Sequence, residues 1–196
     1  MGYTTEFNGS LTLSRTATEQ EKKYINTLSK TRRMKRDINK LMEIYKGQYG
    51  NPFAKSLTVE DIYGVDGEYF AFDDNNHGQL EDASIIDYNT PPGQKEYGLE
   101  NWGENSNRIT KGLCQPGLWC QWVITKDGNE LEWNEAEKFY YYVEWLKYLI
   151  NHFFEEWGIK LNGEISWEGE DSDDTGKIVV EDNIINIVSK NEYGNF

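Results

Sequence analysis

Four cations within five residues form the densest group of reactive side chains in the first part of the sequence. They are Arg32, Arg33, Lys35 and Arg36. Such a cluster can hold the phosphates of a nucleotide or a nucleic acid. Trp119 and Trp122 could add a surface on which a ring stacks, although core packing is the usual fate of large aromatic side chains. The other interpretation of the cations is a solvated helical segment that pairs with carboxylates of the same chain.

A run of carboxylates lies toward the other end of the chain. Its members are Glu168, Glu170, Asp171, Asp173 and Asp174. Calcium-binding loops are similarly rich in oxygen ligands, but this run lacks the sixth-position Gly and the twelfth-position Glu of an EF-hand. A solvated turn between strands and an acidic surface for a partner are the remaining interpretations. We therefore treat the run as a candidate partner-binding surface and expect no metal site.

The other residue types that could do chemistry do not form a catalytic set. They are Glu130 and Glu132, Glu164 and Glu168, His77 and His152, and Cys114 and Cys120. Paired carboxylates act as acid and base only where their environments separate their pKa values, and in alternating strands such residues usually face water. The histidines and cysteines lack the spacing of a zinc site or a CxxC pair. No nucleophile elbow, P-loop or dinucleotide-binding glycine motif is present. We expect no catalytic residue and no cofactor, and whether the protein is an enzyme stays open.

The charge of the chain is divided by position. Residues 1–50 hold ten Lys/Arg and five Asp/Glu, whereas residues 127–196 hold five and seventeen, in a chain of net charge −14. An acidic surface repels nucleic acid and membranes and attracts basic protein surfaces. An aromatic content of 14% argues against disorder. Because no apolar run approaches the roughly 20 residues of a membrane span and no signal-peptide pattern opens the chain, we expect a cytoplasmic protein.

Hydrophobic periodicity predicts the elements that position these residues. Alternation predicts a strand over 3–13, and Thr18 with Glu21 forms a capping box before a helix that begins near Glu19. Helical spacing resumes over 38–45, so the basic segment is either a polar waist in one helix or the junction of two. A second long helix is expected over 134–157, and irregular chain over 47–67 and 89–117. Further strands are expected over 68–73, 84–88, 118–125, 131–133, 161–167, 177–181 and 184–188.

This order of elements predicts an α+β fold. We expect a mixed or mainly antiparallel sheet of about seven to eight strands, with two long helices packed on one face. Two sheets that share a core are the alternative. We expect a single domain over 1–196, with a loop insertion around 89–117. The near-continuous apolar runs at 177–181 and 184–188 favour burial on both faces or a central position in the sheet.

Several motifs resemble one family of uncharacterised small proteins from bacteria and phages. They are GYTTEF at 2–7, TRRMKRD at 31–37, PGLWCQW at 116–122, KFYYYVEWL at 138–146 and GEISWEGED at 163–171. Residues 46–113 fit the resemblance poorly. The resemblance implies no activity, but it favours an origin in a phage or another mobile element.

Three functions are consistent with these observations. The first is a non-enzymatic acidic binding protein, for example a counter-defence inhibitor that occupies the basic groove of a nucleic-acid-handling host protein such as a CRISPR or restriction enzyme. The alternative is a protein that binds a nucleotide or another small anion through the basic segment and the Trp residues. A structural role in a phage particle ranks last, because the chain shows no coiled coil or repeat. We expect a protein partner with a basic surface in the cytoplasm of a bacterial host, and no direct contact with nucleic acid or membrane.

Overall fold

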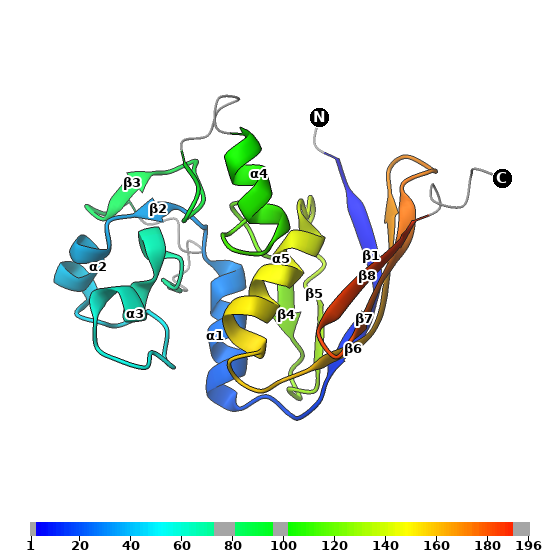
Figure 1. Ribbon diagram of the computed structural model, residues 1–196, viewed down its shortest axis with the longest axis horizontal. Helices are drawn as coiled ribbons and strands as arrows, with labels where there is room; N and C mark the ends of the chain where they lie inside the picture. The colour runs from blue at the N-terminus through cyan, green and yellow to red at the C-terminus, as the bar shows by residue number, and fades with distance from the viewer. Residues whose placement is uncertain (1–2, 73–80, 96–101, 190–196) are drawn as a thin grey trace. The chain divides into compact units, whose positions relative to one another are not determined.

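Alternating apolar residues near the start of the chain produce the first strand, β1 (Thr5–Leu13), in which Thr5, Leu11 and Leu13 are buried. The structure is a computed structural model that describes residues 3–72, 81–95 and 102–189. β1 belongs to a six-stranded antiparallel sheet with the order β4-β5-β1-β6-β7-β8 (Figure 1). Its other strands are β4 (Trp122–Ile124), β5 (Glu130–Trp133), β6 (Leu161–Gly169), β7 (Thr175–Glu181) and β8 (Ile184–Ser189).

Two predicted turns of this sheet are confirmed. The turn between β4 and β5 contains Gly128 with φ of 79°, the left-handed conformation for which glycine is favoured. The turn between β7 and β8 consists of Asp182 and Asn183, whose φ values are 49° and 72°. Asp and Asn are the non-glycine residues that tolerate this region best, which explains why the two-residue hairpin closes without glycine.

The predicted capping box opens the first helix, α1 (Glu19–Lys30). The Thr18 hydroxyl accepts a hydrogen bond from the Glu21 N–H (3.2 Å), and the Glu21 carboxylate accepts one from the Thr18 N–H (2.8 Å). Arg15 donates to both carboxylate oxygens of Glu21 at 2.8 and 2.9 Å. The bidentate Arg15 pair and the Thr18 bonds lower the pKa of Glu21, although its burial opposes them.

We expect the stabilisation that Glu21 provides to be lost in acid. A carboxylate whose pKa is lower in the folded than in the unfolded chain stabilises the fold above its usual pKa of 4.5. That contribution is lost as pH falls through the folded-state value. The difference in unfolding free energy between the wild type and Glu21→Gln should therefore be constant near neutral pH and shrink progressively as pH falls below 4.5. Urea titrations across this range test it, and an unchanged difference in acid would contradict it.

The basic segment is the junction of two helices and not a helical waist. Residues 35–36 form a short strand, β2 (Lys35–Arg36), which pairs with β3 (Ile85–Asp87) in a two-stranded sheet. Asp37 then caps α2 (Ile38–Tyr45) by accepting from the backbone N–H groups of Asn39 and Lys40. The strong N-cap at Asp37 is the local reason that a new helix begins here.

The middle of the chain is more structured than its composition suggests. The expected loop over 47–67 contains α3 (Val59–Tyr63), capped by the Thr58 side chain, and the 3₁₀ turn η1 (Val65–Gly67). The segment 89–117 contains α4 (Trp102–Thr110). The strand expected over 68–73 is wrong for its described residues 68–72, which form no strand. Residues 73–80, which include His77, and residues 96–101 lie outside the described part of the chain.

The second long helix begins later than predicted. It starts as α5 (Tyr142–Leu149) and continues as the π-helical turn η3 (Ile150–Phe154). Glu135, Lys138 and Tyr141 all have positive φ, between 57° and 63°, and so interrupt the helix that periodicity predicted from residue 134. Gly158, with φ of 67°, follows the helical residues as predicted.

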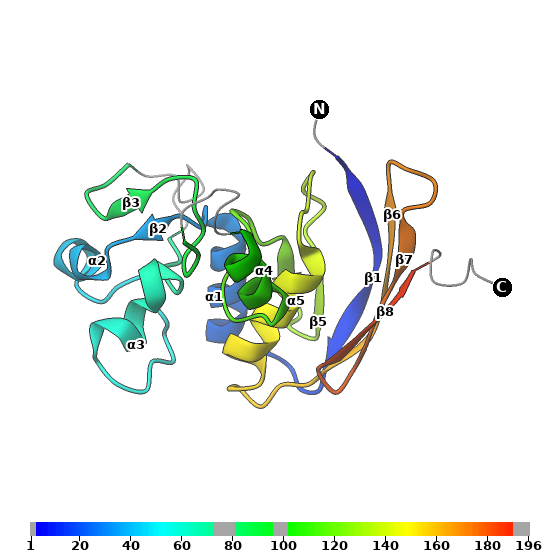
Figure 2. The same ribbon diagram turned by 45° about the horizontal axis from the view of Figure 1, so that its top comes forward.

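The last strand does not have the expected central position. β7 is an inner strand with Ile178 and Val180 buried, but β8 is at the sheet edge with Ile184 exposed by 66%. The strand order places β1, β6, β7 and β8 next to one another, and Figures 1 and 2 show these four strands grouped together. The apolar composition of β8 is therefore not explained by burial.

The chain divides into two compact units, and the second is inserted into the first. The sheet unit comprises residues 1–22 and 121–196, and the inserted unit comprises residues 23–120. The sheet unit holds eight Lys/Arg and twenty Asp/Glu, a balance of −12, whereas the inserted unit holds twelve and fourteen, a balance of −2. The α+β class is thus confirmed, with eight described strands in two sheets and five α-helices of 5–12 residues in place of two long ones. A single folding domain stays a prediction.

Candidate functional site

The acidic run forms the tip of the hairpin between β6 and β7, here called the acidic hairpin (residues 168–174). Its backbone is closed by hydrogen bonds from Gly169 N to Asp174 O (2.8 Å) and from Asp174 N to Asp171 O (2.9 Å). Glu168, Glu170, Asp171 and Asp173 are exposed, and Asp174 is half-buried. The interpretation of the run as a solvated turn between strands is therefore correct, and four of its five carboxylates are accessible to a partner.

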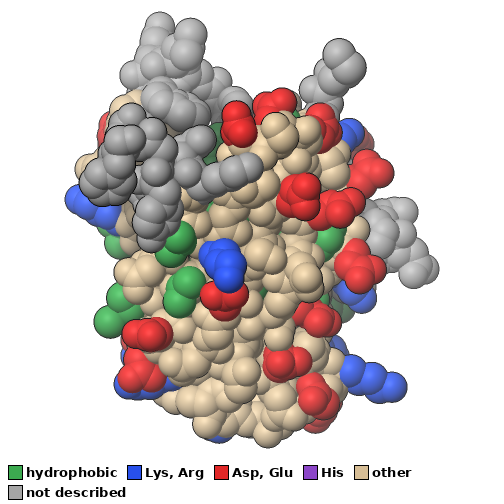
Figure 3. All heavy atoms as spheres, turned by 90° about the vertical axis from the view of Figure 1, so that its right-hand side faces the viewer, with side chains coloured by type: hydrophobic (Ala, Val, Ile, Leu, Met, Phe, Trp, Pro, Cys, Tyr) green, Lys and Arg blue, Asp and Glu red, His purple; other side chains and the backbone are tan. Residues whose placement is uncertain are grey.

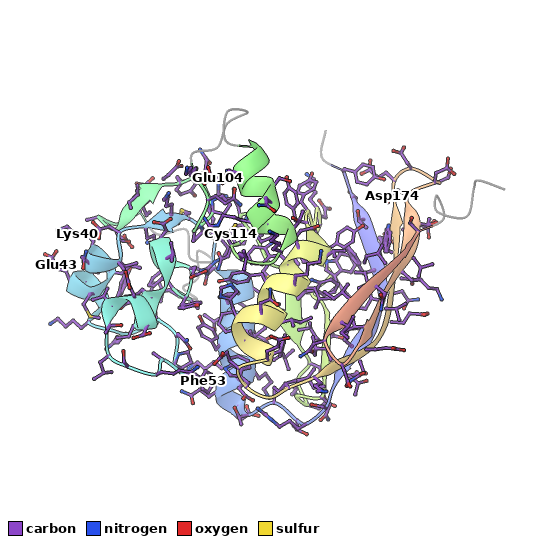
Figure 4. The ribbon with its side chains drawn as sticks, viewed as in Figure 1. Lys40, Glu43, Phe53, Glu104, Cys114 and Asp174 are labelled. Carbon is purple, nitrogen blue, oxygen red and sulfur yellow. The ribbon has the colours of Figure 1, made fainter. Side chains whose placement is uncertain are left out.

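Asp174 has an internal role. One carboxylate oxygen accepts from the Tyr3 hydroxyl (2.7 Å) and the other from the Trp167 indole N–H (3.0 Å). Figure 4 shows Asp174 at the hairpin end of β6 and β7. The hydrogen bond to Asp174 raises the pKa of Tyr3, so the phenol remains a donor. Asp174 therefore positions the hairpin and is not available to a partner as a free carboxylate.

The two residues before β1 make further hydrogen bonds to the hairpin. The Glu170 carboxylate accepts from the Thr4 backbone N–H (2.7 Å), and the Asp171 N–H donates to the Tyr3 hydroxyl (3.3 Å). Residues at the two ends of the sequence thus hold the tip in a defined conformation. A fixed tip presents its carboxylates with little further loss of conformational entropy on binding.

A groove of about 490 Å³ lies on the sheet beside this hairpin. Three consecutive residues from each of β1, β6 and β7 line it, and they lie opposite one another in three cross-strand rows. The first row is Glu6, Glu168 and Thr175, the second is Phe7, Trp167 and Gly176, and the third is Asn8, Ser166 and Lys177. Side chains alternate along strands, so the first and third rows project from one face and the middle row from the other. The floor on the first face is therefore backbone, and a Cβ at Gly176 would overlap the Trp167 ring.

The two long sides of the groove differ in charge. Glu6 lies directly opposite Glu168 in the register of β1 and β6, and neither carboxylate has an ion-pair or hydrogen-bond partner among the described residues. On the other side Lys177 pairs with Glu164 at 2.6 Å, both about half exposed. Acidic side chains also lie along the upper and right-hand margins of the face shown in Figure 3. Glu6 therefore extends the negative charge of the acidic hairpin along the groove.

An aromatic core packs under the other face of this part of the sheet. Phe7 makes edge-to-face contacts with Trp122, Trp133, Phe139 and Tyr142, at centroid distances of 4.9–5.8 Å. Trp122 is fully buried, and its indole N–H donates to the Tyr142 carbonyl (2.9 Å). Core packing is therefore the correct interpretation of Trp122, whose ring has no free face for a ligand. Trp119 is half-buried and belongs to the inserted unit.

Arg33 is an internal residue of the inserted unit and is only 1% exposed. Its guanidinium donates to the carbonyl of Phe70 (2.7 Å), the carbonyl of Glu68 (3.0 Å) and the side-chain amide oxygen of Gln115 (3.0 Å). Three segments far apart in the sequence are joined through this one side chain. These contacts favour internal pairing over phosphate binding.

Arg36 is also buried, at 2% exposure. It donates from Nη1 to the Asp82 carboxylate (2.9 Å) and the Ser84 hydroxyl (2.8 Å), and its guanidinium lies 4.7 Å from the centroid of the Phe70 ring. Burial alone would raise the pKa of Asp82, but the Ser84 hydrogen bond and the Arg36 charge together lower it. The Arg36 Nη2 atom is buried and has no hydrogen-bond partner in the described part of the chain.

The other two cations of the basic segment pair on the surface. Arg32 donates to the Tyr88 carbonyl (3.3 Å) and stacks on its ring, with 4.4 Å between the guanidinium carbon and the ring centroid. Lys35 donates to the Gln94 carbonyl (2.9 Å) and lies 3.3 Å from the Asp66 carboxylate. Each of the four cations therefore has partners within the chain, and Arg33 and Arg36 both contact Phe70. Their phosphate-binding role stays a prediction.

Among the residues that the structure describes, no metal-binding cluster is formed by the other candidate side chains. Within the described ranges, no group of three or more His, Cys, Asp or Glu residues has a geometry that could hold a metal ion. Both cysteines are free and buried, and burial raises the pKa of the Cys114 thiol. Figure 4 labels Cys114 within the inserted unit. In the same ranges, none of the helices combines the length and apolar character needed to cross a bilayer.

Sequence reasoning identified the acidic hairpin but missed Glu6 and Tyr3. Glu6 occupies a polar position of an alternating strand, which marks it as outward-facing, but its pairing with Glu168 requires the strand register. No family model, curated protein or solved structure matches this chain.

Proposed function

We propose that this chain is a binding protein that docks the acidic face of its sheet unit on a basic surface of another protein. The observation that carries the proposal is that Glu6 and Glu168 lie directly opposite each other and have no ion-pair or hydrogen-bond partner among the described residues. Like charges directly opposite across strands destabilise a sheet. A basic partner would relieve this repulsion, so the pair favours the bound state over the free one.

Several features support a groove in a nucleic-acid-handling protein as the target. Such grooves are basic, and charge complementarity speeds encounter and selects partners. The net charge of −12 on the sheet unit supplies the complementary sign. The resemblance to phage proteins adds a setting in which the target is a host defence enzyme, for example a CRISPR or restriction enzyme. The chain then acts in the bacterial cytoplasm as a counter-defence inhibitor without catalysis of its own.

Neutralising Glu168 should have opposite effects on stability and on binding. Glu168→Gln is expected to raise the unfolding free energy by about 0.5 kcal/mol, because it removes the like-charge opposition with Glu6. The same change should weaken partner binding. Glu43→Gln removes an equal charge from the inserted unit and is the matched control, expected to leave binding unchanged. Figure 4 labels Glu43 on α2, next to its ion-pair partner Lys40. Loss of stability in Glu168→Gln would contradict the proposal.

The partner itself is tested by capture from a host lysate at low salt. The expected result is a nucleic-acid-binding enzyme that is released steeply as salt increases, because screening weakens charge-driven complexes. Competition by DNA or RNA for the captured protein would place the chain in its nucleic-acid groove. Recovery of proteins that do not handle nucleic acid, or binding insensitive to salt, would contradict the proposed function.

One observation favours the alternative of a small anionic ligand. The Arg36 Nη2 group is a buried donor that finds no partner among the residues the structure describes, and unsatisfied buried donors are uncommon in folded proteins. Thermal unfolding with a panel of nucleotides and inorganic phosphate tests this alternative. A ligand that raises the melting temperature of the wild type but not of Arg36→Lys would support it, and absence of any shift would exclude it. Trp122 has no part in this site because it is buried in the sheet unit.

A further inference from the structure

β8 forms an open edge of the six-stranded sheet in the described part of the chain. It contains no charged residue, and three of its apolar side chains are exposed: Ile184 by 66%, Ile187 by 39% and Val188 by 36%. Edge strands usually carry a Lys, a Pro or a bulge that prevents pairing with another strand. β8 carries none of these, and its register with β7 is regular throughout.

The hairpin geometry identifies the backbone groups that remain open on β8. In a two-residue hairpin the residues that flank the turn exchange both backbone hydrogen bonds, and such pairs alternate along the strands. Glu181 and Ile184 flank the turn here. The backbone groups directed to β7 are therefore those of Ile184, Asn186 and Val188. Those directed away from the sheet are the groups of Ile185, Ile187 and Ser189.

We propose that two copies of this chain associate by antiparallel pairing of β8 with β8 about a twofold axis at Ile187. This arrangement places Ile187 opposite its own copy and Ile185 opposite Ser189, so all the open groups of the edge exchange hydrogen bonds. On the other face of the strand Val188 lies opposite Asn186. The pairing is self-complementary and joins two six-stranded sheets into one.

The charge distribution selects a second copy as the occupant. The sheet unit has a balance of −12, but Ile184–Ser189 contributes nothing to it. A basic partner would find no carboxylate on this strand, whereas a copy of β8 offers the same uncharged, apolar surface. Isologous contacts also require no second protein. The inference is independent of the proposed function, which uses the acidic face near Glu168.

The net charge determines how this association responds to salt. Two copies of a chain of net charge −14 repel each other, and the short strand buries little area, so dissociation constants on the order of 100 μM are expected at low salt. Added salt screens the repulsion and should strengthen the dimer. Salt should weaken the charge-driven complex with a basic partner, which is the opposite response. An experiment can therefore contradict one proposal without contradicting the other.

Sedimentation equilibrium of the full chain, from about 10 to 300 μM and in about 50 and 500 mM NaCl, tests the proposal. We expect a monomer–dimer equilibrium whose dissociation constant falls several-fold at the higher salt. Ile187→Pro removes an N–H that points away from the sheet, a position where edge strands tolerate proline. This variant should keep the wild-type circular dichroism and weaken dimerisation at least about tenfold. Asn186→Pro removes an N–H directed to β7 and is the matched control, expected to lower the melting temperature.

A second variant keeps the test decisive if Ile187→Pro does not fold. Val188→Lys places a charge on the exposed face of β8 and reduces the net negative charge of the chain. Because repulsion between the copies then becomes weaker, any loss of dimer shows that β8 itself forms the contact. A chain that stays monomeric at the highest concentration and salt would overturn the proposal, as would a dimer unaffected by either folded variant. Stronger dimerisation after truncation at Ser189 would show that the segment after β8 covers the edge in the full chain, and would also overturn it.

Discussion

Replacing Arg33 with Met is expected to lower the unfolding free energy of the inserted unit by about 3 kcal/mol or more. Because Met fills much of the same volume as Arg, the decrease in unfolding free energy measures the lost hydrogen bonds and not the creation of a cavity. Arg33 donates to the carbonyls of Phe70 and Glu68 and to the Gln115 side chain while only 1% exposed. Removing a charged donor from buried acceptors costs about 1–3 kcal/mol for each acceptor left without a partner.

Arg32→Met is the matched control because it removes the same charge one residue earlier from a half-buried side chain. Its cost should stay below about 1 kcal/mol, as for most surface changes. Urea unfolding with hydrogen exchange over residues 23–72 would measure the effect in the inserted unit. Equal costs for the two variants would contradict a structural role for Arg33. A nucleotide that stabilises the wild type but not Arg33→Met would favour the phosphate-binding alternative.

Replacing Trp122 with Ala is expected to destabilise the sheet unit by about 3–5 kcal/mol, the usual cost of deleting a buried indole. Trp122 is fully buried, with Phe7 at 5.6 Å and Phe139 at 5.2 Å between ring centroids. The variant also loses the indole hydrogen bond to the Tyr142 carbonyl. The near-ultraviolet circular dichroism and the urea midpoint should both change.

Tyr140→Ala is the control for Trp122 because its ring is 50% exposed on the same unit. Its cost should be about 1 kcal/mol or less, from the single hydrogen bond that its hydroxyl accepts from the Tyr3 N–H. Similar costs for both variants would show that Trp122 is not part of the core. A loss of ligand binding in Trp122→Ala without a loss of stability would support the stacking role predicted from the sequence.

Elements with strong local signals could be predicted from the sequence. β1 follows from strict alternation, α1 from the reciprocal bonds of Thr18 and Glu21, and the last hairpin from the Asp182–Asn183 turn. In each case the residues that determine the structure lie within a few positions of one another. Local propensity and the final fold agree at these places, so tertiary contacts need not override the pattern.

Elements that depend on distant contacts could not be predicted in this way. Four cations within five residues have the composition of a solvated segment. Arg33 is nevertheless buried, because Glu68, Phe70 and Gln115 supply hydrogen-bond acceptors from 35 to 82 residues away. The start of α5 was misplaced because positive φ at residues such as Lys138 has no reliable signal in a non-glycine residue. The edge position of β8 likewise depends on sheet order, since an apolar strand has the same composition at an edge as in the centre.

The candidate site could be predicted in part for the same reason. The acidic hairpin is a contiguous run, so its carboxylates are visible in the sequence. Glu6 joins them only because it pairs with Glu168, a residue more than 160 positions away. Asp174 differs from the other carboxylates only because of its hydrogen bonds to Tyr3 and Trp167. The composition of the chain therefore predicts that this surface is negatively charged. The pairing register of β1 and β6 is needed to show which of its carboxylates lack a partner.

The insertion of residues 23–120 into the sheet unit has a consequence for the order in which the protein is made. β1 leaves the ribosome before its partners β5 and β6, which begin at residues 130 and 161. At about 5–20 residues per second, β1 waits roughly 10–30 seconds for β6. The inserted unit emerges completely during that interval and can fold first. Nascent β1, with its apolar face and unpaired backbone, is then a segment that a chaperone would protect during translation.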